Sequence, residues 1–200
     1  MVQSHSRSGG LLRQAVAAML AVVALVLAGC PSEPDLVGPA HTGDLRQIRE
    51  LVEAGADVNR TSEGLAPLHI AASRGHVAVA EYLIEAGADI GAKDWAGWTP
   101  LHWAAREEHS GAVAALLCHG ARMDAKDNTG RTPLHLAVEE DSLAAAQALL
   151  AHGANAGAKD NRDRTPADIA AERGHEDLAA LLRDQEGSGS GVEPGTLEGG

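Results

Sequence analysis

A chain of 200 residues with 44% hydrophobic residues, no Phe, one Tyr and three Trp must build any core from Ala, Leu, Val and Ile. This composition argues against a globular core packed around large aromatic side chains, and it favours thin layers that bury small faces against one another. The net charge of −12 gives no support to nucleic-acid binding, which needs a basic patch, and two cysteines cannot form a disulfide framework.

The first 29 residues have the layout of an export signal. Arg7 and Arg13 precede an uncharged apolar run over residues 15–29, which is shorter than the roughly 20 residues that a membrane-spanning helix needs. The run ends in Leu-Ala-Gly-Cys at residues 27–30, and this ending resembles the lipobox of bacterial lipoproteins. The resemblance implies removal of residues 1–29 and lipidation of Cys30. The alternatives are an uncleaved anchor and an ordinary signal with an incidental cysteine.

Lipidation would fix where the protein acts. Acyl chains on Cys30 exceed the two-signal threshold for stable membrane anchoring. By the same resemblance, Pro31 in place of Asp favours the outer membrane over the inner one. Residues 30–35 form a short linker, and the five residues after the cysteine span at most about 18 Å. We therefore expect a lipoprotein that faces the periplasm close to the bilayer. Removal of the signal lowers the net charge to −14, because it contains two arginines and no carboxylate.

A seven-residue phrase recurs every 33 residues along the rest of the chain. It reads APLHIAA at 66–72, TPLHWAA at 99–105, TPLHLAV at 132–138 and TPADIAA at 165–171. A second phrase, such as EAGADI at 85–90, keeps nearly the same interval. Two phrases at one period indicate stacked repeats, and a period of 33 with T-P-L-H-x-A resembles the ankyrin-repeat family. The resemblance implies an all-α solenoid of paired antiparallel helices with hairpin-like loops.

The repeat phrases divide this part of the chain into five units and a tail. The first unit is a degenerate cap, because Pro39 disfavours a helix interior and predicts that the first helix there is short or absent. The last unit ends in charged residues, as a terminal repeat requires, and the Gly/Ser-rich tail is expected to be disordered. The expected boundaries are 36–63 for the N-terminal cap, 64–96, 97–129 and 130–162 for the full repeats, 163–184 for the C-terminal cap and 185–200 for the tail.

Local signals place the helices within each unit. A proline opens the first helix, where its missing N–H would have no partner anyway. Thr99, Thr132 and Thr165 precede these prolines and are expected to cap the helix with the side-chain oxygen. The turn between paired helices carries glycine in two units but Glu108 and Asp141 in the middle ones. A left-handed backbone at those two positions would cost roughly 1–2 kcal/mol.

The histidines favour a structural role over a metal site. His69, His102 and His135 recur at one repeat position, where the resembled family uses histidine to hydrogen-bond neighbouring loops. Equivalent atoms in stacked units lie about 8–10 Å apart, too far for a shared zinc with ligands at about 2.0–2.1 Å. No phosphate-binding loop, HExxH or G-x-S-x-G motif occurs, so we expect neither catalysis nor a cofactor. Cys118 is a lone thiol, which leaves intermolecular pairing open beside an incidental surface position.

When the repeats are aligned, equivalent residues form columns. Trp95 and Trp98 fall in two columns at the loop tips that are polar in the other repeats. In the resembled family these columns are variable surface positions that contact partners, whereas Trp103 occupies an apolar column and is expected in the core. The alternative for Trp95 and Trp98 is that both rings fold over their own loop. The carboxylates nearby predict a partner with Lys or Arg around an apolar pocket. The expected partner-binding residues are Asp94, Trp95, Trp98, Arg106, Glu107, Asn128, Arg131, Glu139 and Glu140.

These features predict a non-catalytic, monomeric, lipid-anchored array that binds a protein partner and no nucleic acid. An immunity or inhibitor lipoprotein that neutralises a basic toxin or enzyme is a second hypothesis, because the chain is acidic. A third is an accessory factor of a periplasmic redox or stress enzyme, with Cys118 or the histidines taking part. The resemblance implies binding in general and does not identify the partner.

Overall fold

The computed structural model describes residues 34–188, and all regular structure in this range is helical apart from an isolated bridge between Ser62 and Leu65. The predicted signal peptide and Cys30 lie outside the described residues. Among the described residues, no helix is long and apolar enough to cross a membrane. The helices are α2 (Val37–Thr42), α3 (Leu45–Glu53), α4 (Pro67–Ser73), α5 (Val77–Glu85), α6 (Pro100–Arg106), α7 (Ser110–Cys118), α8 (Pro133–Glu139), α9 (Leu143–Ala151), α10 (Pro166–Arg173) and α11 (Glu176–Ser188).

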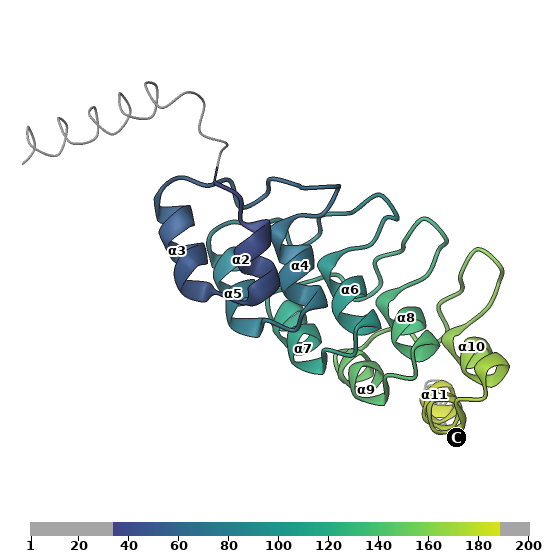
Figure 1. Cartoon of the computed structure of the whole chain (residues 1–200). Helices are drawn as coiled ribbons and strands as arrows, with labels where there is room; N and C mark the ends of the chain where they lie inside the picture. Colours follow the sequence, from purple (N-terminus) through teal and green to yellow (C-terminus); the bar gives the residue numbers. More distant parts are fainter. Residues whose placement is uncertain (1–33, 189–200) are drawn as a thin grey trace, which may run out of the picture. The chain divides into compact units, whose positions relative to one another are not determined.

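The helices form two rows that run side by side. Figure 1 shows α2, α4, α6, α8 and α10 in one row, with α3, α5, α7, α9 and α11 in the other. Each helix packs against its neighbours within its row and against its partner in the same unit. The loops between units all project from the same side of the first row. This arrangement confirms the predicted all-α solenoid of paired helices.

Small apolar side chains fill the space between successive units. Leu68, Leu101 and Leu134 stand 33 residues apart and are fully buried, and Ala71 and Ala104 beside them let neighbouring helices approach closely. Burial of one leucine contributes roughly 1.5–3 kcal/mol relative to leaving it exposed. The core therefore runs through every unit as a repeated layer.

The short turn inside each unit needs a left-handed residue between the two helices. Gly75 takes this conformation, with a φ of 69°. Glu108 and Asp141 take it in the middle units with φ of 61° and 59°, as expected from their alignment with the glycine. Both carry a Cβ, so these turns are strained in a way that the glycine turns are not.

Of the two terminal units, the first has the short helix that Pro39 predicted, and the last differs from expectation. In the first, Pro39 lies inside the short helix α2 at its third position, where its N–H would have no partner within the helix, and the ring is buried. In the last, α11 continues to Ser188, although the tail was expected to be disordered from Gln185. Gln185 and the residue after it are good helix formers, and no proline or capping glycine stops the helix before residue 187.

Candidate functional site

An aspartate closes each of the three loops that follow a full repeat. Asp94, Asp127 and Asp160 are each only 7% exposed. In the first loop, Oδ1 of Asp94 accepts hydrogen bonds from the backbone N–H groups of Ala96 and Trp98, both at 2.8 Å. The other two aspartates repeat this pattern. Asp94 was expected to contact a partner, and the structure instead places it inside the loop that it holds.

In the second and third of these loops, hydrogen bonds keep the aspartate ionised. Burial raises the pKa of Asp127, but hydrogen bonds from Thr129, Arg131 and Trp98 outweigh it and hold the pKa below its ordinary value. The pKa of Asp160 is lowered in the same way, because bonds from Arg164 and Arg162 outweigh its burial. The loops are therefore held by carboxylates through the neutral pH range.

The repeated histidines tie each first helix to the next loop, as predicted. Nδ1 of His102 accepts the backbone N–H of Thr99 at 3.1 Å, and Nε2 lies 3.2 Å from the carbonyl oxygen of Arg131. These partners require a neutral ring with its proton on Nε2. Burial lowers the pKa of His102 to about 4. His69 and His135 make equivalent contacts, and burial lowers their pKa values too.

The threonine caps differ from expectation in two of three units. The hydroxyl groups of Thr99 and Thr132 hydrogen-bond to the histidine three residues later, at 2.9 Å, and not to the helix backbone. Only Thr165 accepts a backbone N–H directly, from Asp168 at 3.2 Å. The histidine in the other units takes the side-chain contact that the helix N–H would otherwise make.

Asparagines at the loop tips join successive loops into a ladder. Asn128 donates its backbone N–H to the carbonyl of Ala96 at 3.0 Å and its side-chain N–H to the carbonyl of Trp95 at 3.1 Å. Asn161 repeats both contacts one unit later, with Thr129 and Asn128. In the first full repeat this position is Trp95, which cannot make the asparagine contact. Its indole is 76% exposed.

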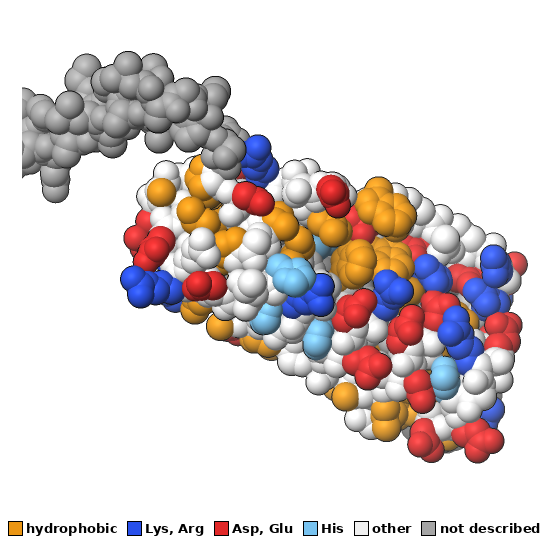
Figure 2. Space-filling model, in the orientation of Figure 1, with side chains coloured by type: hydrophobic (Ala, Val, Ile, Leu, Met, Phe, Trp, Pro, Cys, Tyr) orange, Lys and Arg blue, Asp and Glu red, His pale blue; other side chains and the backbone are white. Residues whose placement is uncertain are grey.

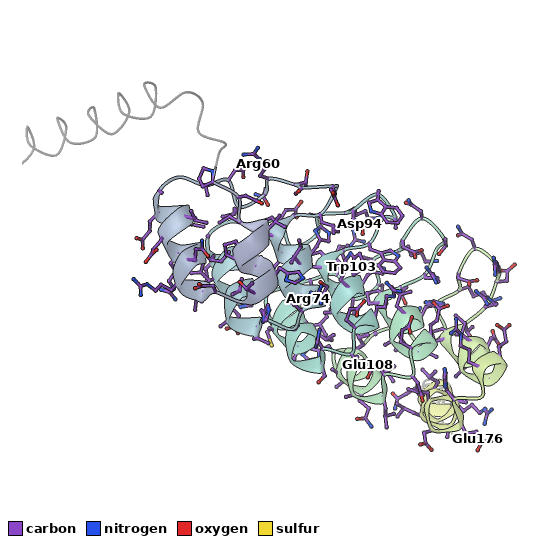
Figure 3. All side chains as sticks on the ribbon, in the orientation of Figure 1. Arg60, Arg74, Asp94, Trp103, Glu108 and Glu176 are labelled. Carbon is purple, nitrogen blue, oxygen red and sulfur yellow. The ribbon has the colours of Figure 1, made fainter. Side chains whose placement is uncertain are left out.

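The other two tryptophans form a half-buried pair beside Trp95's loop. Trp98 and Trp103 meet edge to face with ring centroids 4.9 Å apart. Nε1 of Trp98 donates to Asp127 at 2.9 Å, and Nε1 of Trp103 donates to Asp94 at 3.0 Å. Figure 3 shows Trp103 beside Asp94 on the side of the loops.

These contacts correct two expectations. Trp103 was expected in the core, yet it is only half-buried, because the polar edge of its indole reaches out of the apolar column to Asp94. Trp98 was expected at an exposed tip, yet it lies against the next loop through Asp127. The sequence signal for this cluster was present in the nine-residue spacing from Asp94 to Trp103, but only the fold shows that the two side chains meet.

Arginines and glutamates surround the aromatic pair. The guanidinium carbon of Arg106 lies 5.2 Å from the ring centroid of Trp98, and that of Arg131 lies 6.0 Å from the same ring. Arg106 also lies 3.8 Å from Glu107 and 3.6 Å from Glu140. The expected acidic rim is therefore mixed in charge, and one cation is shared by two exposed carboxylates.

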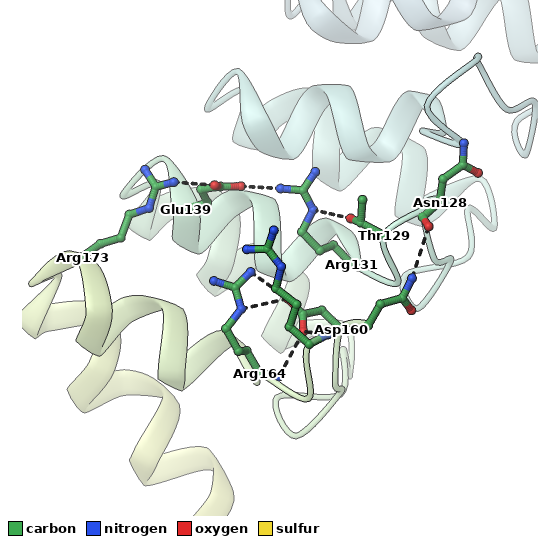
Figure 4. A pocket seen from close by; sticks show the side chains of 9 residues that line it. Asn128, Thr129, Arg131, Glu139, Asp160, Arg164 and Arg173 are labelled. Carbon is green, nitrogen blue, oxygen red and sulfur yellow. Dashed lines mark hydrogen bonds and ion pairs between the residues drawn. The ribbon is translucent and has the colours of Figure 1, made fainter.

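A pocket of about 440 Å³ lies further along the same row of loops (Figure 4). Glu139, expected as a partner contact, stands here between two arginines. It accepts a hydrogen bond from Arg131 at 2.7 Å and pairs with Arg173. Arg164 and Arg173 were not among the expected partner-binding residues, although Arg164 stands 33 residues after Arg131, at the same repeat position. The lining residues are Asn128, Thr129, Arg131, Glu139, Asp160, Asn161, Arg162, Arg164 and Arg173.

The described part of the chain contains no group of three or more histidine, cysteine, aspartate or glutamate side chains placed to hold a metal ion. Cys118 is a free, exposed thiol at the end of α7. Figure 2 shows apolar side chains gathered over the earlier units and alternating blue and red side chains over the later ones.

Comparison with known sequences identifies the family. The family model described as ankyrin repeats in three copies matches residues 39–127 and 112–192, which together cover most of the chain. The chain belongs to the ankyrin-repeat family. Ankyrin repeats are protein-interaction modules and are typically non-catalytic, which agrees with the expected class of function.

Individual ankyrin proteins match over short stretches only. The chain is 49% identical over 47 residues to the potassium channel SKOR of Arabidopsis thaliana, covering 23% of this chain and 6% of the channel. It is 46% identical over 52 residues to ankyrin repeat domain-containing protein 40 of Mus musculus, covering 25% of this chain and 14% of that protein. It is 40% identical over 57 residues to protein phosphatase 1 regulatory subunit 12A of Mus musculus, covering 28% of this chain and 6% of the subunit. Each match spans one to two repeats of this chain and only a small part of the relative's own length.

Proposed function

We propose that this ankyrin array is a lipid-anchored, non-catalytic binding module that captures a protein partner around Trp95. The observation that carries the proposal is the 76% exposed indole of Trp95 on a loop whose backbone is fixed on both sides. Asp94 closes that loop from within, and Asn128 of the next loop bonds to the carbonyl of Trp95 itself. The indole is thus presented on a rigid support.

An exposed indole on a rigid loop suits a binding role. Trp is enriched among the few residues that supply most of the free energy of protein association, and such residues act best in pockets that exclude water. A rigid support reduces the conformational entropy lost on binding. Leu143, on α9, is the other large apolar side chain that the described residues expose, and it is 39% exposed. Trp95 therefore stands apart from the ordinary apolar surface.

The charges around Trp98, which belongs to the same loop as Trp95, define what the partner should offer. Glu107 and Glu140 are exposed and share one cation, Arg106, so this rim keeps net negative charge. A partner with an apolar pocket for the indole and a Lys or Arg opposite these glutamates would complement it. Complementary rim charges mainly raise the association rate, which should then fall as salt is added.

The anchor is the second part of the proposal. It rests on the apolar run that ends in Leu-Ala-Gly-Cys, and it assigns the mature chain to the periplasmic face of a membrane, the outer one in preference to the inner. Replacing Cys30 by serine removes the thiol that lipidation requires. Cys30→Ser should accumulate uncleaved or leave the lipoprotein pathway. Incorporation of labelled palmitate by this variant, at the size of the mature protein, would refute the anchor.

The binding function is tested by capture of a partner in membranes. The full-length protein, Trp95→Ala and Leu143→Ala are each crosslinked in cells and purified under denaturing conditions. A partner that the wild type and Leu143→Ala capture in equal amounts, and that Trp95→Ala loses while folding normally, supports the proposal. The expected loss is about 2–4 kcal/mol of binding free energy. Equal capture by all three proteins would remove Trp95 from the binding surface.

A further inference from the structure

The pocket between the last two loops, α8 and α10 is lined by several guanidinium groups. Four arginines line it, and four carboxylates pair with them, those of Asp127, Glu139, Asp160 and Glu172. The side chains of Asp127 and Asp160 are only 1% and 2% exposed, so guanidinium groups predominate where the pocket faces solvent. Its walls also carry two asparagine side chains and one threonine. A local excess of guanidinium groups on an acidic protein indicates a site for an anionic group.

The guanidinium groups are fixed in position and still have donors left. Arg164 donates through Nε and Nη2 to Asp160 and through Nη1 to Glu172, and it is 28% exposed. Arg131 is held by Asp127 and Glu139 and is 21% exposed. A guanidinium has five N–H donors, so each of these arginines keeps donors that an incoming acceptor can use. Fixing the side chain in advance lowers the entropy lost on binding.

Glu139 and Arg173 form the adaptable side of the pocket. Figure 4 shows the carboxylate of Glu139 between the guanidinium groups of Arg131 and Arg173. Arg173 is 47% exposed, and its hydrogen bond to Glu139 uses only Nη2. A second carboxylate can therefore bind to the remaining donors of Arg173, or replace Glu139 on them. The pocket already holds one carboxylate in the way that it would hold another.

We infer that this arginine pocket binds an acidic segment of a protein through the segment's carboxylate side chains. Planar carboxylates match the paired donors of guanidinium groups. The asparagine and threonine side chains offer donors and acceptors for peptide groups, which a bare phosphate would not use. Glu139 and Asp160 in the wall disfavour a doubly charged phosphate more than a singly charged carboxylate. The inference relies on the proposed function only in taking the ligand to be a protein, and it does not require Trp95 to bind.

Two pairs of charge-matched variants test the pocket. The probe is fluorescein-labelled hexaglutamate, with hexalysine and hexaglutamine as comparison peptides, and fluorescence anisotropy measures binding to the full-length protein in detergent. Arg173→Gln removes one charge at the pocket, whereas Arg46→Gln removes the same charge from α3, where the side chain is 88% exposed. Glu139→Gln removes the internal competitor, and Glu50→Gln is its control on α3.

The pocket and a general charge effect predict different results. If the pocket binds carboxylates, Arg173→Gln weakens hexaglutamate binding about three- to tenfold and Glu139→Gln strengthens it about threefold, while both α3 variants change it by less than about twofold. Hexaglutamine should not bind, and any binding of hexalysine to the acidic chain should not be weakened by Arg173→Gln. These peptides contain no apolar side chain, so a failure here would leave the Trp95 proposal untouched.

Three outcomes would overturn the inference. Equal effects of Arg173→Gln and Arg46→Gln would show that only the overall charge matters. Absence of hexaglutamate binding to the wild type would exclude the site, and tight binding of inorganic pyrophosphate without hexaglutamate would assign it to phosphate. Thermal melts check that each variant is folded. If Arg173→Gln is unstable, Arg162→Gln replaces it, because that exposed side chain also lines the pocket.

Discussion

The loop at residues 94–98 and the loop at residues 127–131 have the same backbone and opposite surfaces. In both, a buried aspartate accepts the N–H groups two and four residues later. The second position of the loop is Trp95 in one and Asn128 in the other, and the fifth is Trp98 in one and Arg131 in the other. The later loop satisfies its polar groups within the stack, whereas the earlier one leaves an indole facing solvent.

This difference separates residues that build the stack from residues that have no role in it. Asn128 bonds backward to the preceding loop, and Arg131 is held by Asp127 and Glu139. Trp98 takes part as well, through its bond to Asp127. Among the side chains of these two loops that carry a polar group, only that of Trp95 makes no hydrogen bond. Its presence is better explained by something outside the array, and the comparison can be tested by changing one loop at a time.

The largest effect is expected from the aspartates that hold the loops. Asp127→Ala removes the acceptor for two backbone N–H groups, for Trp98 and for Arg131. It should lower the free energy of unfolding by about 3–5 kcal/mol, because it leaves a half-buried guanidinium short of a partner and several donors unsatisfied. Asp94→Ala should cost less, because no arginine depends on Asp94. Urea denaturation measures both, and equal losses would contradict the described difference between the loops.

A smaller effect should appear with pH at His102, which joins the two loops through the carbonyl of Arg131. Burial lowers the pKa of His102 from 6.5 to about 4, so the folded state binds fewer protons than the unfolded state between these values. Its contribution to stability is complete above about pH 6.5 and is lost as the pH falls through 4. The loss approaches about 3 kcal/mol, at 1.36 kcal/mol per unit of pKa.

The variant His102→Gln isolates this contribution. Glutamine can accept the N–H of Thr99 and donate toward Arg131, but it does not titrate. The variant should therefore lose less stability than the wild type between pH 7 and pH 4, in thermal melts at closely spaced pH values. Some acid sensitivity should persist, because burial also lowers the pKa values of His69 and His135. An unchanged pH dependence in the variant would show that His102 is not the group responsible.

The roles of these histidines could be predicted from sequence, and the surroundings of the tryptophans could not. The 33-residue period places every copy of a column in the same environment, so one hydrogen-bonding role applies to His69, His102 and His135 alike. Trp103 is the one aromatic residue in a column of aliphatic residues, and the 33-residue period does not predict how an indole packs at that position. Trp103 was expected to be buried because the other residues of its column are aliphatic. In the structure its indole N–H instead donates to Asp94.

The arginine pocket lay beyond sequence reasoning for a related reason. Arg131 and Glu139 are eight residues apart, and Glu139 and Arg173 are 34 apart. The first pair lies within one unit and recurs in the next as Arg164 and Glu172, whereas the second pair depends on the lateral offset between α8 and α10. The alignment of the repeats predicts on which face of the solenoid each residue lies, but it does not predict its interaction partners in other units. Glu139 was accordingly predicted as a partner contact, without its internal pairing with Arg131 and Arg173.

An intermediate effect on stability is expected from the polar edge of Trp98. Trp98→Phe keeps an aromatic ring against Trp103 but removes the donor to Asp127. Loss of one hydrogen bond to a charged group should cost about 1.5–3 kcal/mol, reduced toward 1 because Asp127 keeps its bonds from Arg131. Chemical denaturation measures the change. Trp95→Phe serves as the control, since no bond from that indole is lost, and a cost equal to that of Trp98→Phe would mean that the hydrogen bond contributes nothing.

The smallest effect on stability should come from Trp95, and here the sign matters more than the size. At Asn128 and Asn161 the side chain bonds to the carbonyl 33 residues earlier, and the residue 33 positions before Trp95 is Ser62. Gly64, which lies next to the indole, has the same left-handed φ of 79° as Gly97 and Gly130, the glycines that face the two asparagines. The carbonyl of Ser62 already accepts the N–H of Leu65, so an asparagine at position 95 would add at most a weak contact. Trp95→Asn should leave the free energy of unfolding unchanged or raise it by about 0.5 kcal/mol.

The same substitution should abolish capture of the partner, because it removes the indole and keeps the loop. A variant that is at least as stable as the wild type and yet no longer binds would show that Trp95 is kept at this position for recognition and not for folding. Crosslinking in membranes and urea denaturation of the same preparation provide the two measurements. A loss of more than about 1 kcal/mol in stability would instead assign Trp95 to stiffening its own loop, since exposed positions without a structural role change stability by about 0.5 kcal/mol or less.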